Sequence, residues 1–276
     1  MIKTFPVICG SAAGNPSSLG VKLHNAGYKT LGLDWSYVAM GASSVEEVMS
    51  AFKTLSFRGL GVSMPFKQDI IKYLDEIDDS VKAIGACNTV FNARYKDGND
   101  TGEDHLIGYN TDWVGARDAL LEVVDLGTIK TAVIIGAGGV ARAIAYALKN
   151  NGIDVYISAR KKDQRDKLVR EIELKGAVSL EEQGSVNAQL IVNATPIADP
   201  NGPVVLSAHK NAQVVFDVVF QTAMTDLTTA AKNAGLKYVP GWRMLLLQGV
   251  KQLEIYTGMK APVPEMSRVL EEWLKI

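Results

Sequence analysis

A glycine-rich segment in the middle of the chain has the spacing of a phosphate-binding loop. Gly136, Gly138 and Ala141 fit the pattern G-x-G-x-x-A, with Gly139 beside the second glycine, directly after the apolar stretch 131–135. The first glycine of this pattern permits a tight turn, the second admits a pyrophosphate, and the small third residue lets helix and strand pack closely. Amide groups at the helix start then hold the phosphates. The segment predicts a dinucleotide site, and the alternative is a glycine turn that binds nothing.

The end of the next predicted strand indicates which dinucleotide is bound. NAD sites usually carry Asp or Glu about 20 residues on, where the carboxylate holds the ribose 2′-hydroxyl. Here the strand 154–158 is followed by one alanine and then by Arg160, Lys161 and Lys162, while its acidic residue, Asp154, stands at the opposite end. A guanidinium group suits a 2′-phosphate by its charge and by stacking on adenine. The turn therefore predicts NADP, and the alternative is a basic turn in solvent.

Three stretches in the first part of the chain concentrate small polar groups around one lysine and one aspartate. They are residues 62–67 (VSMPFK), 85–89 (GACNT) and 108–113 (GYNTDW). Each lies at one end of a predicted strand, and open α/β sheets bind ligands at strand ends. Taken singly, Lys67 is typical of a surface residue and Asp112 of a helix cap. The three stretches gain significance only as part of a larger set of motifs.

The elements that must position these residues alternate along the chain between strands and helices. Strands are predicted at 6–10, 35–40, 58–63, 88–92, 105–109, 131–135, 154–158, 190–193 and 214–219. Helices are predicted at 19–30, 45–55, 65–74, after Gly136 and after Trp242, and residues 97–100 (DGND) predict a hairpin turn. Strands separated by single helices predict an open α/β sheet, and a second, doubly wound unit of the nucleotide-binding type begins near Ile129.

Composition narrows the possible functions. The chain has 276 residues, is 47% hydrophobic and carries a net charge of -1, so no basic field exists to attract nucleic acid. No stretch is long and apolar enough to predict a membrane span, and the N-terminus is a poor signal peptide, so we expect a cytoplasmic protein. The few potential metal ligands lack the spacing of a metal site, and none is predicted; they are Cys9, Cys87, His24, His105 and His209.

Taken in order, six motifs resemble those of the shikimate dehydrogenase family. They are VSMPFK, IGACNT, GYNTDWVG, GAGGVARA, NATP and GWRMLLLQG. The resemblance implies an N-terminal substrate-binding domain of residues 1–113 plus 243–276, to which the C-terminal helix returns. It also implies a Rossmann-type NADP domain of residues 114–242, an active site in the cleft between the two, and a role in aromatic amino acid biosynthesis.

The resemblance also implies roles for individual residues. Lys67 and Asp112 would form the catalytic pair in a reversible hydride transfer between the nicotinamide and a ring carbon, with the lysine meeting the charge on the carbonyl oxygen. The residues implied to bind substrate are Ser18, Ser63, Asn88, Asp112 and Gln248. The residues implied to bind NADP are Gly136, Gly138, Gly139, Ala141, Arg160, Lys161, Asn193, Thr195 and Gly241, the last beside the nicotinamide.

Two positions depart from the family pattern. The family has S-x-S-P-x-x-H-N near its N-terminus, where two serines bind the substrate carboxylate; here Ser18 is kept but Gly20 replaces the second serine. Phe220 replaces the usual tyrosine. We therefore expect an NADP-dependent dehydrogenase of shikimate or a close cyclic hydroxy acid. The alternatives are a quinate-preferring or NAD-using relative, and a non-catalytic dinucleotide-binding sensor. The motifs predict no oligomeric state.

Overall fold

The chain folds into two compact units. The structure is a computed structural model that describes residues 7–96, 99–100, 102–197 and 202–276. Unit 1 comprises residues 1–111 with 249–273, and unit 2 comprises residues 112–248 with 274–276. Within the described residues no helix is both long and apolar enough to span a bilayer, and no cluster of His, Cys, Asp and Glu is arranged to hold a metal ion.

Unit 1 is built on a mixed six-stranded sheet in the order β2-β1-β3-β5-β8-β4. Its strands are β1 (Val7–Ala13), β2 (Trp35–Gly41), β3 (Gly59–Val62), β4 (Glu76–Ile77), β5 (Thr89–Asn92) and β8 (Leu106–Tyr109). Only β5 runs antiparallel to its neighbours. The short strands β6 (Tyr95–Lys96) and β7 (Asn99–Asp100) pair separately with each other. The hairpin turn predicted at 97–100 falls partly on residues 97–98, which lie outside the described residues.

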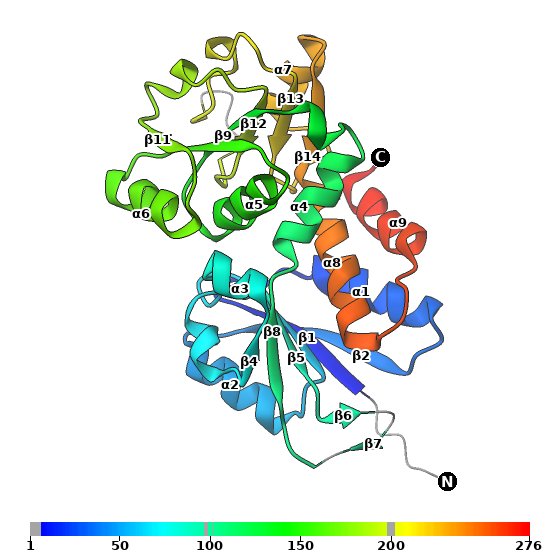
Figure 1. The fold of residues 1–276 in the computed structure, drawn as a ribbon. Coiled ribbons are helices and arrows are strands. Elements are labelled where there is room, and N and C mark those ends of the chain that lie inside the picture. The colour runs from blue at the N-terminus through cyan, green and yellow to red at the C-terminus, as the bar shows by residue number, and fades with distance from the viewer. Residues whose placement is uncertain (1–6, 97–98, 101, 198–201) are drawn as a thin grey trace. The chain divides into compact units, whose positions relative to one another are not determined.

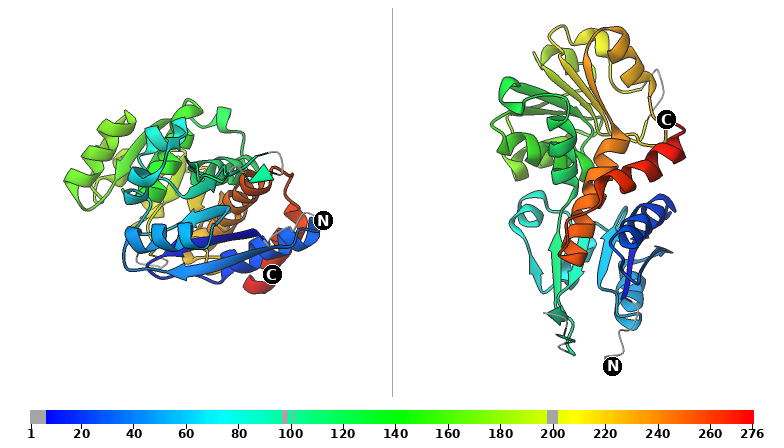
Figure 2. Two further views of the ribbon diagram at one scale, coloured as in Figure 1. Left: turned by 90° about the horizontal axis from the view of Figure 1, so that it is seen from below. Right: turned by 90° about the vertical axis from the view of Figure 1, so that its right-hand side faces the viewer.

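The helices of unit 1 cover the sheet through apolar faces. They are α1 (Leu19–Thr30), α2 (Val45–Thr54), η1 (Asp69–Tyr73), α3 (Asp79–Ile84), the second half of α8 (Gly241–Thr257) and α9 (Val263–Leu274). On one face, α2 buries Val48 and Phe52 against Leu60 of β3. Helices α8 and α9 return to α1 (Figure 2). There, Leu253 and Met266 lie against Gly27. The C-terminal helix therefore belongs to the first unit, as predicted.

Unit 2 contains an all-parallel six-stranded sheet in the order β11-β10-β9-β12-β13-β14. Its strands are β9 (Thr131–Ile135), β10 (Asp154–Ser158), β11 (Gly176–Val178), β12 (Leu190–Asn193), β13 (Val214–Asp217) and β14 (Lys237–Pro240). Alternate residues of β9 enter two separate cores, Ile134 on one face and Val133 on the other. Burial of both faces explains why the strand sequences are continuously apolar.

The helices of unit 2 lie on both faces of this sheet (Figure 1). They are α4 (Asp112–Leu121), α5 (Gly139–Asn150), α6 (Lys162–Ile172) and α7 (Asp226–Asn233), with short 3-10 helices η2 (Leu126–Thr128), η3 (Gln183–Ser185) and η4 (Leu206–Ala208). Helices α4, α5 and α6 share one core, and α7 belongs to the other. The doubly wound α/β prediction is confirmed.

Most predicted elements form, and one helix prediction is wrong. The helix expected over 65–74 is only a 3-10 helix, η1, preceded by turns. Pro65 follows a cis Met64–Pro65 bond, which the residue pattern did not anticipate. The helix at 45–54 is capped at its start: the Ser44 side chain accepts from Glu47 N, and the Glu47 carboxylate accepts from Ser43 N. The strands β4, β11 and β14 and the helix α3 were not predicted.

Candidate functional site

The predicted cofactor residues of unit 2 follow strands that end at the same level of one sheet edge. Ile135, Ser158, Asn193 and Asp217, the last residues of β9, β10, β12 and β13, lie in register across the sheet. Pro240 of β14 continues this row. The segments that follow these residues carry the glycine loop, the basic turn, the NATP stretch and Gly241. The parallel sheet thus brings the predicted cofactor residues to its carboxyl edge, where open α/β sheets bind ligands.

The two glycines of the loop serve different purposes. Gly136 has φ +122°, and a Cβ there would lie 2.9 Å from the carbonyl oxygen of Ala194. Gly138 is the N-cap of α5 with φ -85°, and a Cβ there would meet no protein atom within 4 Å. Gly136 is therefore required by the protein itself, whereas Gly138 keeps open the space in front of the helix start. Behind it, Ala141 is fully buried in the core. This arrangement fits a pyrophosphate.

The basic turn after β10 is exposed. Arg160, Lys161 and Lys162 are all exposed, and within the described residues none of the three forms an ion pair. Lys161 is the N-cap of α6, and its side chain makes no capping bond. Ser158 is buried and donates to the carbonyl oxygen of Ser179. The residues present therefore fit a 2′-phosphate, since a cationic turn, rather than a carboxylate, directly follows the strand.

Asn193 holds a neighbouring loop with its side-chain amide. Its Nδ2 donates to Asp217 Oδ1 (2.9 Å) and to the Ile197 carbonyl oxygen (3.1 Å). Its Oδ1 accepts from the backbone N–H (3.1 Å) and the hydroxyl (2.8 Å) of Thr195. Two donated and two accepted bonds fill the capacity of an amide. Asn193, predicted to bind the cofactor, thus uses its side chain to hold the 194–197 segment.

Gly241 begins α8 immediately after β14. A Cβ at this position would clash with the carbonyl group of Val218 and with the carbonyl oxygen of Val219. The two backbone segments therefore touch, and only glycine allows it. This packing supplies a structural reason for the glycine that was predicted to lie beside the nicotinamide.

In unit 1, the predicted catalytic residue Lys67 and the predicted substrate-binding residues Ser63 and Asn88 converge at the carboxyl end of β3. Ser63 follows β3 directly, and its N–H donates to Ala12 of β1 (2.9 Å). The carbonyl oxygen of Lys67 accepts from Cys87 N (2.7 Å), and the carbonyl oxygen of Asn88 accepts from Val62 N (2.7 Å). These bonds hold the 63–67 and 85–88 segments side by side. Ser63 is exposed and Lys67 half-buried, whereas Asn88 is buried.

The Asn88 side chain is held by a buried hydrogen-bond network. Its Oδ1 accepts from Thr111 N (2.7 Å) and from the Thr89 hydroxyl (2.8 Å), and its Nδ2 donates to the Thr111 hydroxyl (2.9 Å). These bonds fix which way the amide faces. Thr111 immediately precedes Asp112, which begins α4 and is 6% exposed. Asp112 belongs to unit 2 by the division of the chain, and Lys67 to unit 1.

One polar residue near this network was missed by sequence reasoning. Gln252 of α8 is 4% exposed, and its Nε2 donates to the carbonyl oxygen of Asn88 (3.2 Å) and to the Thr89 hydroxyl (3.0 Å). Gln248, the predicted substrate contact, lies one turn earlier and donates to Leu245 of its own helix. The four-residue spacing of the two glutamines places them on the same helix face, and this was the available signal.

The segment expected to bind the substrate carboxylate lies at the start of α1. Ser17 Oγ accepts from the N–H of Leu19, the first residue of the helix. The hydroxyl of Ser18, the N-cap, is exposed and makes no hydrogen bond with a described residue. A Cβ at Gly20 would have only Tyr37 Cε1 within 4 Å, at 3.9 Å. The backbone N–H of Gly14 donates to Met64, which ties this loop to the Ser63 segment. A hydroxyl at position 20 would therefore fit.

His24 and Cys87 are packing residues. His24 is 1% exposed, and its ring stacks on that of Tyr37 with the two ring centroids 4.0 Å apart. Its Nδ1 forms a hydrogen bond with the carbonyl oxygen of Gly20. Burial lowers the pKa of His24 from 6.5 to about 4. Burial likewise raises the pKa of the Cys87 thiol to about 12. Neither group is suited to acid–base chemistry near neutral pH.

The buried, neutral His24 leads us to expect a loss of stability in acid. Its pKa in the folded protein is depressed, so its contribution is present above pH 6.5 and is lost as the pH falls from 6.5 towards 4. The loss near pH 4 amounts to about 3 kcal/mol. Urea unfolding at several pH values should show this loss in the wild type and a smaller one in His24→Phe, which keeps a ring against Tyr37. Equal acid dependence in both proteins would contradict it.

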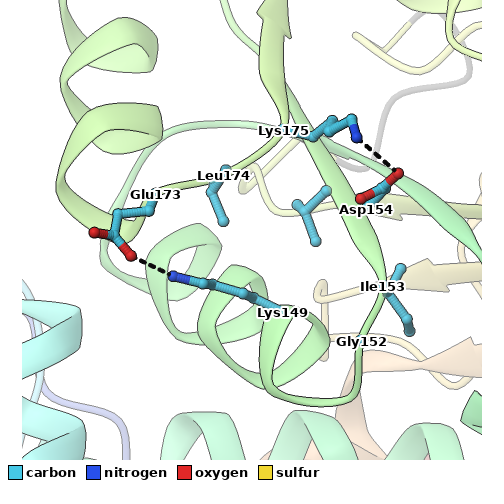
Figure 3. A pocket seen from close by; sticks show the side chains of 8 residues that line it. Lys149, Gly152, Ile153, Asp154, Glu173, Leu174 and Lys175 are labelled. Carbon is cyan, nitrogen blue, oxygen red and sulfur yellow. Dashed lines mark hydrogen bonds and ion pairs between the residues drawn. The ribbon is translucent and has the colours of Figure 1, made fainter.

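A pocket of about 400 Å³ lies elsewhere in unit 2 (Figure 3). Its lining includes the start of β10 and the ends of α5 and α6. Both lysines that line the pocket form ion pairs, Lys149 with Glu173 (3.0 Å) and Lys175 with Asp154 (3.4 Å). Because Asp154 begins β10, this pocket is at the amino edge of the sheet, opposite the glycine loop. It is separate from the candidate cofactor site.

Three family models match successive parts of the chain. Residues 11–90 match the shikimate dehydrogenase substrate binding domain, residues 131–231 match NADP oxidoreductase coenzyme F420-dependent, and residues 241–271 match the shikimate 5'-dehydrogenase C-terminal domain. The first match contains Ser18, Ser63, Lys67 and Asn88, and the second contains the glycine loop.

Whole-length relatives agree with these matches. A shikimate dehydrogenase (NADP(+)) of Haloarcula marismortui is 38% identical over 271 residues, covering 95% of this chain and 97% of the relative. A crystal structure of a shikimate dehydrogenase in complex with NADP+ has a TM-score of 0.84 and 32% identity, covering 99% of this chain and 97% of the other. A structure of quinate dehydrogenase from Corynebacterium glutamicum in complex with NAD has a TM-score of 0.85 and 25% identity, covering 98% of this chain and 99% of the other.

Proposed function

Because the chain belongs to the shikimate dehydrogenase family, we propose that it catalyses the reversible, NADP-dependent interconversion of shikimate and 3-dehydroshikimate. The observation that carries this proposal is the 38% identity over 95% of the chain to an NADP-dependent shikimate dehydrogenase. The glycine loop and the basic turn supply the chemistry that such a cofactor needs, and Lys67 lies within the matched substrate-binding region.

We assign Lys67 the central chemical role. When bound, NADP would supply or accept the hydride. During reduction, the substrate carbonyl oxygen gains negative charge and needs a proton or a cation beside it. The ammonium group of Lys67 meets this need, and in the reverse direction its neutral amine accepts the hydroxyl proton. Asp112 would orient the ammonium group and balance its charge.

Three polar groups of unit 1 and one residue of α8 would bind the substrate. Ser18 and Ser63 present exposed hydroxyls that make no hydrogen bond with a described residue, and we assign Ser18 to the carboxylate and Ser63 to a ring hydroxyl. Asn88 has a fixed amide orientation, which suits recognition of a further ring hydroxyl. Gln248 is proposed as an additional contact from α8.

Cofactor selectivity is assigned to the turn after β10. We propose that Arg160 and Lys161 contact the 2′-phosphate of NADP, while the backbone of Gly138 and Gly139 contacts the pyrophosphate. Thr195 and Gly241 would line the same edge of the sheet. We further propose residues 1–113 plus 243–276 as the catalytic substrate domain, residues 114–242 as the NADP domain, and the cytoplasm as the location of the protein.

A quinate-preferring or NAD-using relative is the second candidate function. Gly20 and Phe220 each remove a hydroxyl that the family usually offers to substrate, which favours an altered substrate preference. The similarity to a quinate dehydrogenase in complex with NAD supplies a precedent for this fold. The exposed cations after β10 argue for NADP over NAD, and they rank this candidate second.

The deciding experiment measures formation of reduced nicotinamide. Purified protein is mixed with NADP⁺ or NAD⁺, and with shikimate or quinate, and the absorbance of the reduced cofactor is followed. The proposal expects the highest kcat/KM with NADP⁺ and shikimate. A higher value with quinate, or with NAD⁺, would establish the second candidate. If neither acid led to reduction of the cofactor while NADPH still bound, both candidate functions would be rejected. The chain would then be a dinucleotide-binding protein that oxidises neither shikimate nor quinate.

Gly20→Ser tests the missing carboxylate donor. The added hydroxyl has room beside Tyr37 and restores a charge-assisted bond worth about 1.5–3 kcal/mol. We therefore expect kcat/KM for shikimate to rise by roughly ten-fold or more, with little change in the KM for NADP⁺. Steady-state kinetics of the variant and the wild type provide the measurement. An unchanged or lower value would mean that position 20 does not face the carboxylate.

A further inference from the structure

Asp217 is a buried carboxylate that the proposed chemistry does not use. It ends β13, is 1% exposed and lies in register with Asn193. Its Oδ1 accepts from Asn193 Nδ2 (2.9 Å) and from Val219 N (3.2 Å), and its Oδ2 accepts from the Thr225 hydroxyl (2.6 Å). Within the described residues it forms no ion pair with a cation. A buried charge with only neutral donors is costly unless those donors are held in place.

The first branch of this network leads to the loop after β12. An ionised carboxylate only accepts hydrogen bonds, so Asn193 must turn its Nδ2 towards Asp217. The Asn193 Oδ1 then faces Thr195 and accepts hydrogen bonds from its backbone N–H and from its hydroxyl. The carboxylate therefore dictates the amide orientation that holds residues 194–197. The carbonyl oxygen of Ala194 in this segment lies against Gly136 of the phosphate-binding loop.

The second branch leads to the start of α8. Val219 N donates to Asp217, and the carbonyl groups of Val218 and Val219 lie against Gly241. Thr225, which donates the third bond, is the N-cap of α7. The Asp217 carboxylate is thus bonded to Asn193, which holds the segment after β12, and directly to Val219 in the segment after β13. Each of these two segments touches a glycine of the candidate cofactor edge.

Burial and the hydrogen-bond donors have opposite effects on the pKa of Asp217. Burial raises the pKa of its carboxyl above the usual value, and the bonds from Thr225, Val219 and Asn193 act in the opposite direction. The donors that hold the two segments are therefore the same groups that favour the charged form.

We propose that Asp217 is a positioning residue for the NADP site, acting through Asn193 and Val219 on the two segments beside the phosphate-binding loop and Gly241. The assignment rests on the proposed use of NADP. Asp217 touches neither cofactor nor substrate in this account. It sets the orientation of the hydrogen bonds that shape the carboxyl edge of the sheet.

Asp217→Asn is the first variant to test. The variant keeps the size of the side chain. However, its amide nitrogen is a donor at a position where a carboxylate oxygen of Asp217 accepts hydrogen bonds, so at least one of these bonds is lost. We expect the Kd for NADPH, measured by the cofactor's fluorescence, to rise at least about ten-fold. The KM for shikimate at saturating NADP⁺ should change less than about two-fold, because Ser18, Ser63 and Asn88, which are proposed to bind substrate, belong to unit 1 and make no bond to Asp217. The matched control is Asp226→Asn, an exposed carboxylate in the first turn of α7, which should leave both values unchanged.

The reciprocal double variant Asp217→Asn with Asn193→Asp separates positioning from general loss of structure. The swap restores a donor facing an acceptor between the two positions, and the carboxylate introduced at position 193 can still accept from Thr195. Partial recovery of NADPH affinity relative to Asp217→Asn is the expected result. Wild-type NADPH affinity in Asp217→Asn would overturn the positioning role of Asp217 but not the proposed function. A folded double variant that recovers no NADPH affinity would have the same meaning. A wild-type protein that binds no NADPH would overturn the proposed function and this assignment together.

Discussion

Replacing Lys67 with alanine is expected to lower kcat for shikimate oxidation by about 10²–10⁴-fold, the usual contribution of one positioned acid–base group. Both directions of the reaction should suffer, because the same group donates the proton in one and accepts it in the other. Asp112→Asn should cause a smaller loss, since it leaves the lysine in place and removes only the proposed orienting charge.

The control for Lys67→Ala is another lysine of the same segment. Lys72 lies in η1, is exposed and pairs with Glu46 at 3.5 Å, so Lys72→Ala removes an equal charge at the surface. It should leave kcat unchanged. NADPH affinity, measured without substrate, should be unaffected in both variants because the proposed cofactor groups belong to unit 2. Full turnover of Lys67→Ala would remove the mechanism proposed for this chain.

Gly138→Ala is expected to weaken NADPH binding by about 10²-fold while leaving the fold intact. The added Cβ meets no protein atom within 4 Å, and φ -85° suits any residue. Its only steric cost arises where a pyrophosphate would approach the start of α5. Replacing glycine at a compatible position also restricts the unfolded chain, so Tm should stay the same or rise slightly.

Gly136→Ala provides the contrasting variant in the same loop. At φ +122° an alanine is strained, and its Cβ would lie 2.9 Å from the carbonyl oxygen of Ala194. We expect Tm to fall in this variant, with cofactor affinity falling as a consequence. Thermal unfolding and NADPH titration of the two proteins should therefore separate a glycine needed by the ligand from one needed by the fold. Similar Tm losses in both would contradict that division.

The sequence was most informative where burial imposes a regular pattern. The strands β9, β10 and β12 have the predicted limits because both faces of their sheet are covered and their residues are continuously apolar. The glycine loop was recognisable because its glycines answer a geometric demand, a positive φ at Gly136 and an open approach at Gly138. Local patterns of this kind need no knowledge of distant residues.

Other features depend on contacts that no local pattern encodes. The strands β4 and β11 contain two and three residues, too few for an alternation to stand out. Gln252 resembles any polar helix residue until the fold brings Asn88 and Thr89 to it from more than a hundred and sixty positions away. Asn193 was recognised within a motif, but only the structure shows that Asp217 and Thr195 occupy its amide.

The discontinuity of unit 1 has a consequence for how the protein is made. Its core lacks Leu253, Tyr256 and Met266 until the last part of the chain is synthesised, and Tyr256 lies directly over Gly59 of β3. Residues 112–248 of unit 2, by contrast, are contiguous and leave the ribosome together. The half of the protein translated first is therefore the half that completes its folding last. Until then, the α1 face around Gly27 remains uncovered in the nascent chain, at the stage when association with other unfinished chains is easiest.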